Sequence, residues 1–208
     1  MKKSEKLNAE RSFAAELARQ DVTNNKKGIR LGSTASHAKG ADYKVRDYLM
    51  VKGVGSTDDV RCRPGSKHDW ELTIRRTLHV VGETKVGTGA LRYAKTAEEL
   101  SFDPDYIYPD VDYIAYCVDS RKLKAHPERM NQLFRVFTRD EFLQVLVDCG
   151  RKGLESSLRI HQSTSGTWQL EIVAWSNSQT AARLGKYESW IKAHDIPTLE
   201  EFRTELRG

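Results

Sequence analysis

Hydrophobic and polar residues alternate along two neighbouring stretches of the chain, which predicts two half-buried β-strands. The first stretch spans residues 69–74, and its apolar face consists of Trp70, Leu72 and Ile74. The second stretch, residues 79–86, carries Glu83 and Lys85 two positions apart. Because successive side chains on a strand point to opposite faces, we expect this carboxylate and this amine to emerge on the same side of the sheet.

The length of the turn between these strands decides which residues face each other. If residues 75–77 form a three-residue turn, Ile74 pairs with Leu78 and the apolar faces of both strands coincide. A two-residue turn would put the two faces out of phase, so we expect the three-residue turn. In that register Asp69 falls directly opposite Glu83.

Two opposed carboxylates are destabilising unless a cation lies between them, because their Cβ atoms are roughly 4.5–5.5 Å apart. Mg2+ suits such a pair, since this ion takes one or two carboxylates and fills its other positions with water and substrate phosphate. The sequence therefore predicts a Mg2+ site at Asp69 and Glu83, with Mn2+ as the alternative ion. A slip of the turn by one residue on each strand would set Glu71 opposite Glu83, which makes Glu71 the alternative first acid.

This arrangement of acids and lysine resembles the PD-(D/E)xK nuclease superfamily, the fold of many restriction endonucleases and resolvases, over roughly residues 41–119. In that family the first acid and the E-x-K triplet lie on adjacent strands, preceded by a helix and followed by a helix and another strand. The resemblance implies that Asp69, Glu83 and the main-chain carbonyl of Thr84 bind the metal. It also implies that Lys85 positions or activates the water that attacks the phosphate.

The chain departs from the family pattern at two positions next to these acids. His68 stands where a proline is frequent, and Gly82 replaces the usual large apolar residue before the glutamate. The choice between Asp69 and Glu71 is a third departure. All three departures bear on which residue is the family's first acid. They bear less on the assignment of Glu83 and Lys85 to the E-x-K triplet.

The pattern along the rest of the chain predicts three segments. Residues 1–40 carry nine lysines and arginines against four acids, and combine a short helix, Asn8–Arg19, with a flexible connection, Asp21–Lys39. Residues 41–150 hold the nuclease-like α/β core. Residues 151–208 add a hairpin and helices that we expect to pack on that core.

Within this organisation we expect a central mixed β-sheet flanked by helices, the architecture of a restriction-endonuclease-like core. Residues 111–118 are apolar on both faces, which predicts a strand inside a covered sheet. Capping boxes at Thr96–Glu99 and Thr138–Glu141 predict the starts of two helices. The other expected elements are a helix at 41–51, strands at 60–63 and 134–137, a hairpin at 158–175, and helices at 178–194 and 198–206.

Composition excludes several classes of protein. No apolar run approaches the roughly 20 residues that span a bilayer, and the lysine-rich start lacks the apolar stretch of a signal peptide. Cys62, Cys117 and Cys149 are odd in number and form no C-x-x-C pair, so neither a disulfide framework nor a structural zinc site is expected. No G-x-x-x-x-G-K-[ST] loop occurs, so no nucleotide cofactor is expected. We expect a cytoplasmic protein without a membrane partner.

The charge of the chain favours a polyanionic partner. The net charge is +5, and the excess of basic residues in the segment 1–40 equals that of the whole chain. Neutralising phosphates releases counterions and so supplies affinity that does not depend on sequence. We therefore expect a metal-dependent endonuclease that hydrolyses phosphodiester bonds of DNA, with RNA as the alternative substrate and a homodimer as a further option. The competing hypothesis is a non-catalytic DNA-binding or protein-interaction protein on the same fold.

Overall fold

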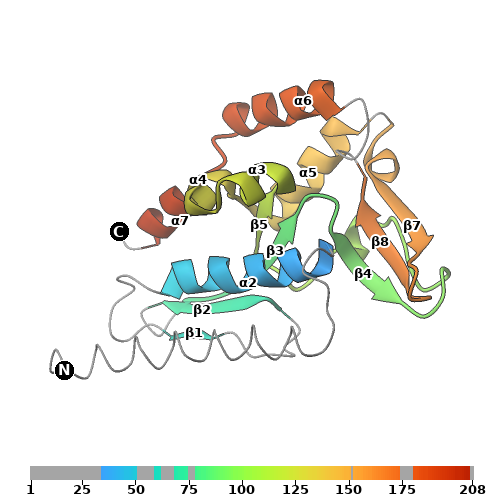
Figure 1. The fold of residues 1–208 in the computed structure, drawn as a ribbon, viewed down its shortest axis with the longest axis horizontal. Coiled ribbons are helices and arrows are strands. Elements are labelled where there is room, and N and C mark those ends of the chain that lie inside the picture. Colours follow the sequence, from blue (N-terminus) through green and yellow to red (C-terminus); the bar gives the residue numbers. More distant parts are fainter. Residues whose placement is uncertain are drawn as a thin grey trace, which may run out of the picture. The chain divides into compact units, whose positions relative to one another are not determined.

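The computed structural model describes residues 34–50, 59–61, 68–74, 78–150, 152–173 and 180–206 (Figure 1). Its internal contacts divide the chain into two units, Met1–Lys39 and Gly40–Gly208, and the second unit contains every described strand. The predicted helix Asn8–Arg19 lies outside the described residues.

Helix α2 (Thr34–Met50) begins earlier than we predicted, because residues 34–39 belong to it and not to a flexible connection. Those residues carry no apolar stripe, so hydrophobic periodicity did not indicate a helix there. The predicted apolar face of the helix is confirmed, since Val45 and Leu49 are buried and Tyr48 packs beside them.

The main sheet is mixed, and its strands lie in the order β1-β2-β3-β5-β6 (Figure 1). Strands β3 and β5 are parallel, and all other neighbours are antiparallel. The first three strands form an antiparallel meander. The strand bounds are β1 Asp59–Arg61, β2 Trp70–Ile74, β3 Leu78–Val86, β5 Tyr113–Cys117 and β6 Arg135–Thr138.

Strand β5 is buried on both faces, as its composition predicted, and it separates two hydrophobic clusters. Ala115 and Cys117 join the cluster that contains α2 and α7 (Leu199–Glu205). Ile114 and Tyr116 join the cluster that contains α5 (Arg139–Cys149) and α6 (Thr180–Ala193). The sheet is therefore covered by helices on both sides.

A second, three-stranded antiparallel sheet has the order β4-β8-β7, with bounds β4 Ala90–Ala94, β7 Leu158–Gln162 and β8 Trp168–Ile172. The predicted hairpin is confirmed, because Leu158 pairs with Ile172 and Ile160 with Leu170. Leu158, Leu170 and Ile172 are buried in the same cluster as α5, so this hairpin packs on the core.

The helix predicted from Thr96 was wrong. After β3 the chain forms β4, then turns, and then a single 3-10 turn, η1 (Pro104–Tyr106). The residues of the supposed capping box make only a local turn, in which Leu100 N donates to Ala97 O over 3.0 Å. Pro104 disfavours the helical conformation of the residue before it, and Asp103 is accordingly extended.

Two capping boxes form, and the first of them is the one predicted at Thr138. Thr138 accepts a hydrogen bond from Glu141 N at the start of α5, and Thr198 accepts one from Glu201 N at the start of α7. The remaining helical pieces are α3 (Ser120–Ala125), η2 (Pro127–Arg129), α4 (Met130–Leu133) and η3 (Leu154–Ser156). Within the described residues, no helix has both the length and the apolar composition that crossing a bilayer requires.

Candidate active site

The register of β2 and β3 matches the one predicted from the sequence. Trp70 faces Gly82, and the pairing runs without a bulge to Ile74 facing Leu78. The connection between the strands is therefore the three residues 75–77, whose own structure is not described. Asp69 directly precedes Trp70, the first paired residue of β2, and so lies at the position that faces Glu83.

The Asp69 carboxylate is fixed by the main chain of β3. Its Oδ2 accepts a hydrogen bond from Thr84 N over 2.8 Å. The N–H and C=O groups of one strand residue project toward the same neighbouring strand. The carbonyl of Thr84 therefore projects to the side of Asp69, beyond the end of β2, while the Thr84 side chain is buried on the face that Ala115 occupies.

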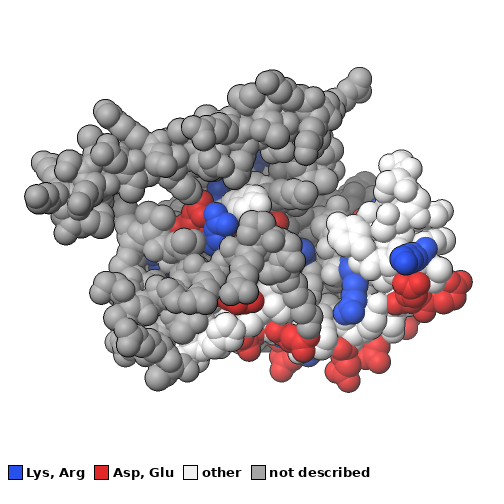
Figure 2. All heavy atoms as spheres, turned by 90° about the horizontal axis from the view of Figure 1, so that it is seen from below, with Lys and Arg blue, Asp and Glu red and all other residues white. Residues whose placement is uncertain are grey.

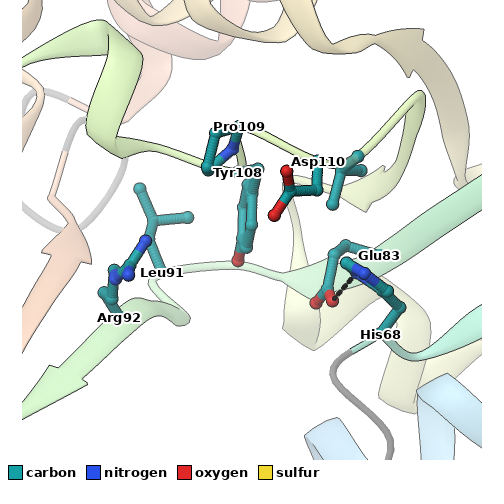
Figure 3. Close-up of a pocket in the computed structure, with 8 residues that line it drawn as sticks. His68, Glu83, Leu91, Arg92, Tyr108, Pro109 and Asp110 are labelled. Carbon is teal, nitrogen blue, oxygen red and sulfur yellow. Dashed lines mark ion pairs between the residues drawn. The ribbon is translucent and has the colours of Figure 1, made fainter.

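Glu83 lies at the centre of a small group of charged side chains. Its side chain is only 9% exposed, and its Oε2 lies 3.5 Å from Lys85 Nζ. Its Oε1 lies 3.8 Å from His68 Nδ1 (Figure 3). Burial raises the pKa of Glu83 to about 8; the Lys85 ammonium acts to lower it, and Asp69 raises it as a like charge and as a hydrogen-bond partner. Without metal, Glu83 thus keeps its proton up to about pH 8, and a bound cation would favour its charged form instead.

Lys85 shares the face of Glu83, as the two-residue spacing predicted. Its side chain is 19% exposed, and its Nζ lies 5.7 Å from the centre of the Tyr108 ring. Burial acts to lower the pKa of Lys85, but Tyr108, Asp69 and Glu83 together hold that pKa above its ordinary value. The amine therefore stays protonated at neutral pH.

A pocket of about 250 Å³ opens beside Glu83 (Figure 3). Its walls come from the start of β4, from the loop that precedes β5, and from His68. Tyr108 and Asp110 extend from that loop toward the side of the pocket where Glu83 lies, and Arg92 stands on the opposite side (Figure 3). The other lining residues are Leu91, Pro109 and Val111.

The departure at Gly82 has a steric explanation. Trp70 is fully buried and faces Gly82 across the strands, and a Cβ at Gly82 would lie 2.0 Å from its indole ring. The indole occupies the volume that a large side chain before the glutamate would otherwise fill. The small residue at position 82 thus makes room for the large Trp70 side chain, and Glu83 keeps its position on the strand.

The alternative acids do not reach the same spot. Glu71 faces Val81, one pair further along the ladder, so its side chain lies diagonal to Glu83 and not opposite it. Asp47, a carboxylate on α2, pairs with Arg46 at 2.7 Å. Helix α2 packs with Val80 and Ala115, on the face of the sheet opposite to Glu83. Asp69 is therefore the acid that the structure sets against Glu83.

The oxygen donors fit a hard divalent ion that keeps several waters. Among the described residues, no group of three or more His, Cys, Asp or Glu side chains could enclose a metal. The available donors are the carboxylates of Asp69 and Glu83 and the Thr84 carbonyl. Such a set matches Mg2+, which is held by one or two carboxylates, water and phosphate, and does not match a closed structural zinc site.

The loop from η1 to β5 is the part of the site that sequence reasoning missed. Tyr108 and Asp110 lie in the loop that leads into β5. Strand β5 is the parallel neighbour of β3, with Tyr113 paired to Gly82. Parallel pairing at that register places the residues before Tyr113 beside the residues before Glu83. Recognising β5 as the parallel neighbour of β3 would have identified this loop.

The charge of the described surface can be compared with the polyanionic partner expected from the sequence. On the face shown in Figure 2, Asp and Glu side chains gather along the described part of the surface, and few Lys or Arg side chains lie among them. This visible part would repel a polyanion.

Comparisons with the models of known protein families, with curated proteins and with solved structures find no match to this chain.

Proposed function

We propose that this protein is a metal-dependent endonuclease with a PD-(D/E)xK-type site, acting on the phosphodiester bonds of DNA, with RNA as the alternative substrate. The observation that carries the proposal is the placement of Asp69 opposite Glu83 with Lys85 on the same face. Glu83 lines a pocket, and the Asp69 carboxylate, the Thr84 main chain and the largely shielded Lys85 amine lie next to it on β2 and β3. That combination suits phosphate chemistry better than it suits a simple structural ion pair.

The topology supports the family assignment in part. A helix, a three-strand meander and a parallel fourth strand follow the order that the family requires. The family's helix after the E-x-K strand is replaced here by β4 and η1. This difference weakens the likeness of the folds but leaves the donors on β2 and β3 in place.

Each residue of the site has a role that follows from its contacts. Asp69, Glu83 and the Thr84 carbonyl would hold Mg2+, and the hydrogen bond from Thr84 N fixes the direction of the Asp69 carboxylate. A bound Mg2+ lowers the pKa of a coordinated water and offsets charge that develops on the phosphate. The Lys85 ammonium, largely shielded from solvent, stabilises negative charge on phosphate oxygens more strongly than an exposed lysine would.

A second candidate is a nucleic-acid-binding protein without catalysis. The observation in its favour is that Lys85 Nζ lies 3.5 Å from Glu83 Oε2, so the amine has a partner without metal or substrate. Such a protein would bind DNA in a salt-sensitive manner, and neither Mg2+ nor substitution of Glu83 would change that binding.

The deciding experiment is a cleavage assay on end-labelled duplex, single-stranded and branched DNA, with RNA in parallel, in Mg2+ and in chelator. We expect cleavage only with metal, and a loss of about 10²-fold or more in Glu83→Gln, Asp69→Asn and Lys85→Ala, the scale for removal of one electrostatic group. Glu188→Gln and Lys192→Ala, both exposed on α6, are the matched controls. Cleavage that persists in Glu83→Gln and Lys85→Ala would refute the assignment.

A further inference from the structure

Strand β4 contains a β-bulge where it forms a wall of the pocket. Its register against β8 shifts between Ala90 and Arg92, which makes Leu91 an extra residue in the strand. Arg92 therefore pairs with Leu170, a residue of the buried face, whereas regular pairing would set it opposite Gln169 on the other face. The bulge thus turns Arg92 to the side of the sheet where it lines the pocket together with Leu91.

The guanidinium of Arg92 is held by one residue of the neighbouring loop. Its Nη1 donates to Tyr106 O over 3.0 Å, and its Cζ lies over the Tyr106 ring, 4.1 Å from the ring centre. Stacking occupies the face of a guanidinium and leaves the N–H groups at its edge available. An arginine has five N–H donors, and toward the described residues that of Arg92 makes one hydrogen bond and no ion pair. Other arginines pair with a carboxylate, namely Arg46, Arg135, Arg139 and Arg159.

The loop that carries Tyr106 is itself fixed from its other side. Arg139, the first residue of α5, donates from Nε to Ile107 O over 3.0 Å and from Nη2 to Pro104 O over 2.5 Å. The partner of Arg92 is thus anchored, and so is the guanidinium that it holds. A side chain that is already positioned loses less conformational entropy when a ligand binds to it.

The charges around the pocket indicate which ligand Arg92 suits. Among the described residues that line the pocket, Arg92 is the one lysine or arginine, and it lies on the side opposite to Glu83 and Asp110 (Figure 3). A guanidinium with free edge N–H groups binds a phosphate through two parallel hydrogen bonds. The phosphate that is cleaved would lie at the metal beside Glu83. The anion that reaches Arg92 across the pocket is then another phosphate of the same strand.

We propose that Arg92 binds the phosphate next to the scissile one, so that the substrate strand crosses the pocket from the metal site at Glu83 to β4. The inference rests on the proposed nuclease function and extends it, because it requires a charged phosphate on one side of the cleaved bond. It also gives the bulge in β4 a function, since regular pairing would turn Arg92 away from the pocket.

The test measures how salt changes the binding of fluorescent duplex DNA, by anisotropy in chelator. Each phosphate contact contributes about 0.9 to the slope of log K against log salt concentration. We expect Arg92→Ala to lower that slope by about one and to weaken binding about tenfold, the effect of losing hydrogen bonds to a charged group. Arg92→Lys keeps the charge, so it should keep the slope while binding more weakly. Melting temperatures show that both variants fold.

Arg121→Ala is the matched control, because it removes the same charge from an exposed position. Arg121 lies on α3, whose Leu123 packs in the cluster that contains α2, on the other face of the main sheet. Its slope should equal that of the wild type. A wild-type slope in Arg92→Ala would overturn the inference, and so would equal reductions in Arg92→Ala and Arg121→Ala. Absence of binding to nucleic acid at low salt would overturn it as well.

A second measurement locates the phosphate that Arg92 binds. Substrates with one uncharged methylphosphonate at a time are cleaved by the wild type and by Arg92→Ala. At one phosphate next to the cleaved bond, we expect the replacement to raise KM about tenfold in the wild type and to have little effect in Arg92→Ala, because the two changes remove the same contact. Equal increases in both proteins would overturn the assignment. If the wild type cleaves no nucleic acid, the nuclease function fails, and the salt slope still decides whether Arg92 binds a phosphate.

Discussion

The indole ring of Trp70 lies directly over the main chain of Gly82 on the neighbouring strand, so that a Cβ on residue 82 would lie 2.0 Å from the ring. This contact lies next to Glu83, at the point where β2 begins. It links the packing of the core on one face of the sheet to the position of the carboxylates on the other.

Gly82→Ala should therefore destabilise the protein. Because the buried indole has no room to move, we expect the free energy of unfolding to fall by about 1–3 kcal/mol, the usual cost of overpacking. Urea denaturation measures this change. Gly185→Ala in α6 is the matched control, since nothing lies within 4 Å of its added Cβ, and it should stabilise by about 0.5–1 kcal/mol. Equal stabilities of the two variants would contradict the proposed contact.

The raised pKa of Glu83 predicts how stability changes with pH in the absence of metal. Between pH 4.5 and about 8, the folded state keeps a proton that the unfolded state has lost. The free energy of unfolding should therefore decrease as pH rises through this window, by at most about 1.4 kcal/mol per pH unit from this group. Denaturation at pH 5, 7 and 8.5 in chelator measures the slope. In Glu83→Gln the slope should be smaller, and an unchanged slope would show that Glu83 is not the titrating group.

Mg2+ should stabilise the folded protein, and the variants should identify which acids bind it. We expect Mg2+ to raise the melting temperature of the wild type, more at pH 8.5 than at pH 6, because the ion must displace the proton held at Glu83. Asp69→Asn should abolish the increase. Glu71→Gln should retain it, because Glu71 faces Val81 and not Glu83. The reverse result would assign the first metal ligand to Glu71.

Arg139 should control the order of the loop that carries Tyr108. In Arg139→Lys the ammonium cannot reproduce both hydrogen bonds to Ile107 O and Pro104 O. We expect faster hydrogen exchange in residues 104–112 by mass spectrometry, with little change in β7 and β8. Arg121→Lys, on the exposed part of α3, provides the comparison. Wild-type exchange rates in the loop of Arg139→Lys would contradict the role given to Arg139.

The register at the site could be predicted because local rules determine it. Two alternating strands joined by a short turn leave few pairings that bury Leu72 and Val80 together, and only one of them sets Asp69 against Glu83. The capping boxes at Thr138 and Thr198 were predictable for the same reason, since their partners lie three residues away.

The missed features depend on distant partners. Strand β4 pairs with β8, more than seventy residues later, and nothing in its own pattern indicates that pairing. The helix predicted at Thr96 followed a capping-box pattern that Pro104 prevents from extending. The position of Tyr108 near Lys85 depends on the parallel pairing of β3 with β5, which alternation of polar and apolar residues does not specify.

The central claim is that Asp69 and Glu83 share a divalent metal ion, and a crystal soaked with Mn2+ tests it most directly. Anomalous diffraction locates Mn2+ without reference to activity or substrate. We predict a peak between the Asp69 and Glu83 carboxylates, within coordination distance of the Thr84 carbonyl, that is absent from crystals of Glu83→Gln. A map with no peak at this position at millimolar Mn2+, with both carboxylates free of lattice contacts, would contradict the metal site and with it the proposed nuclease function.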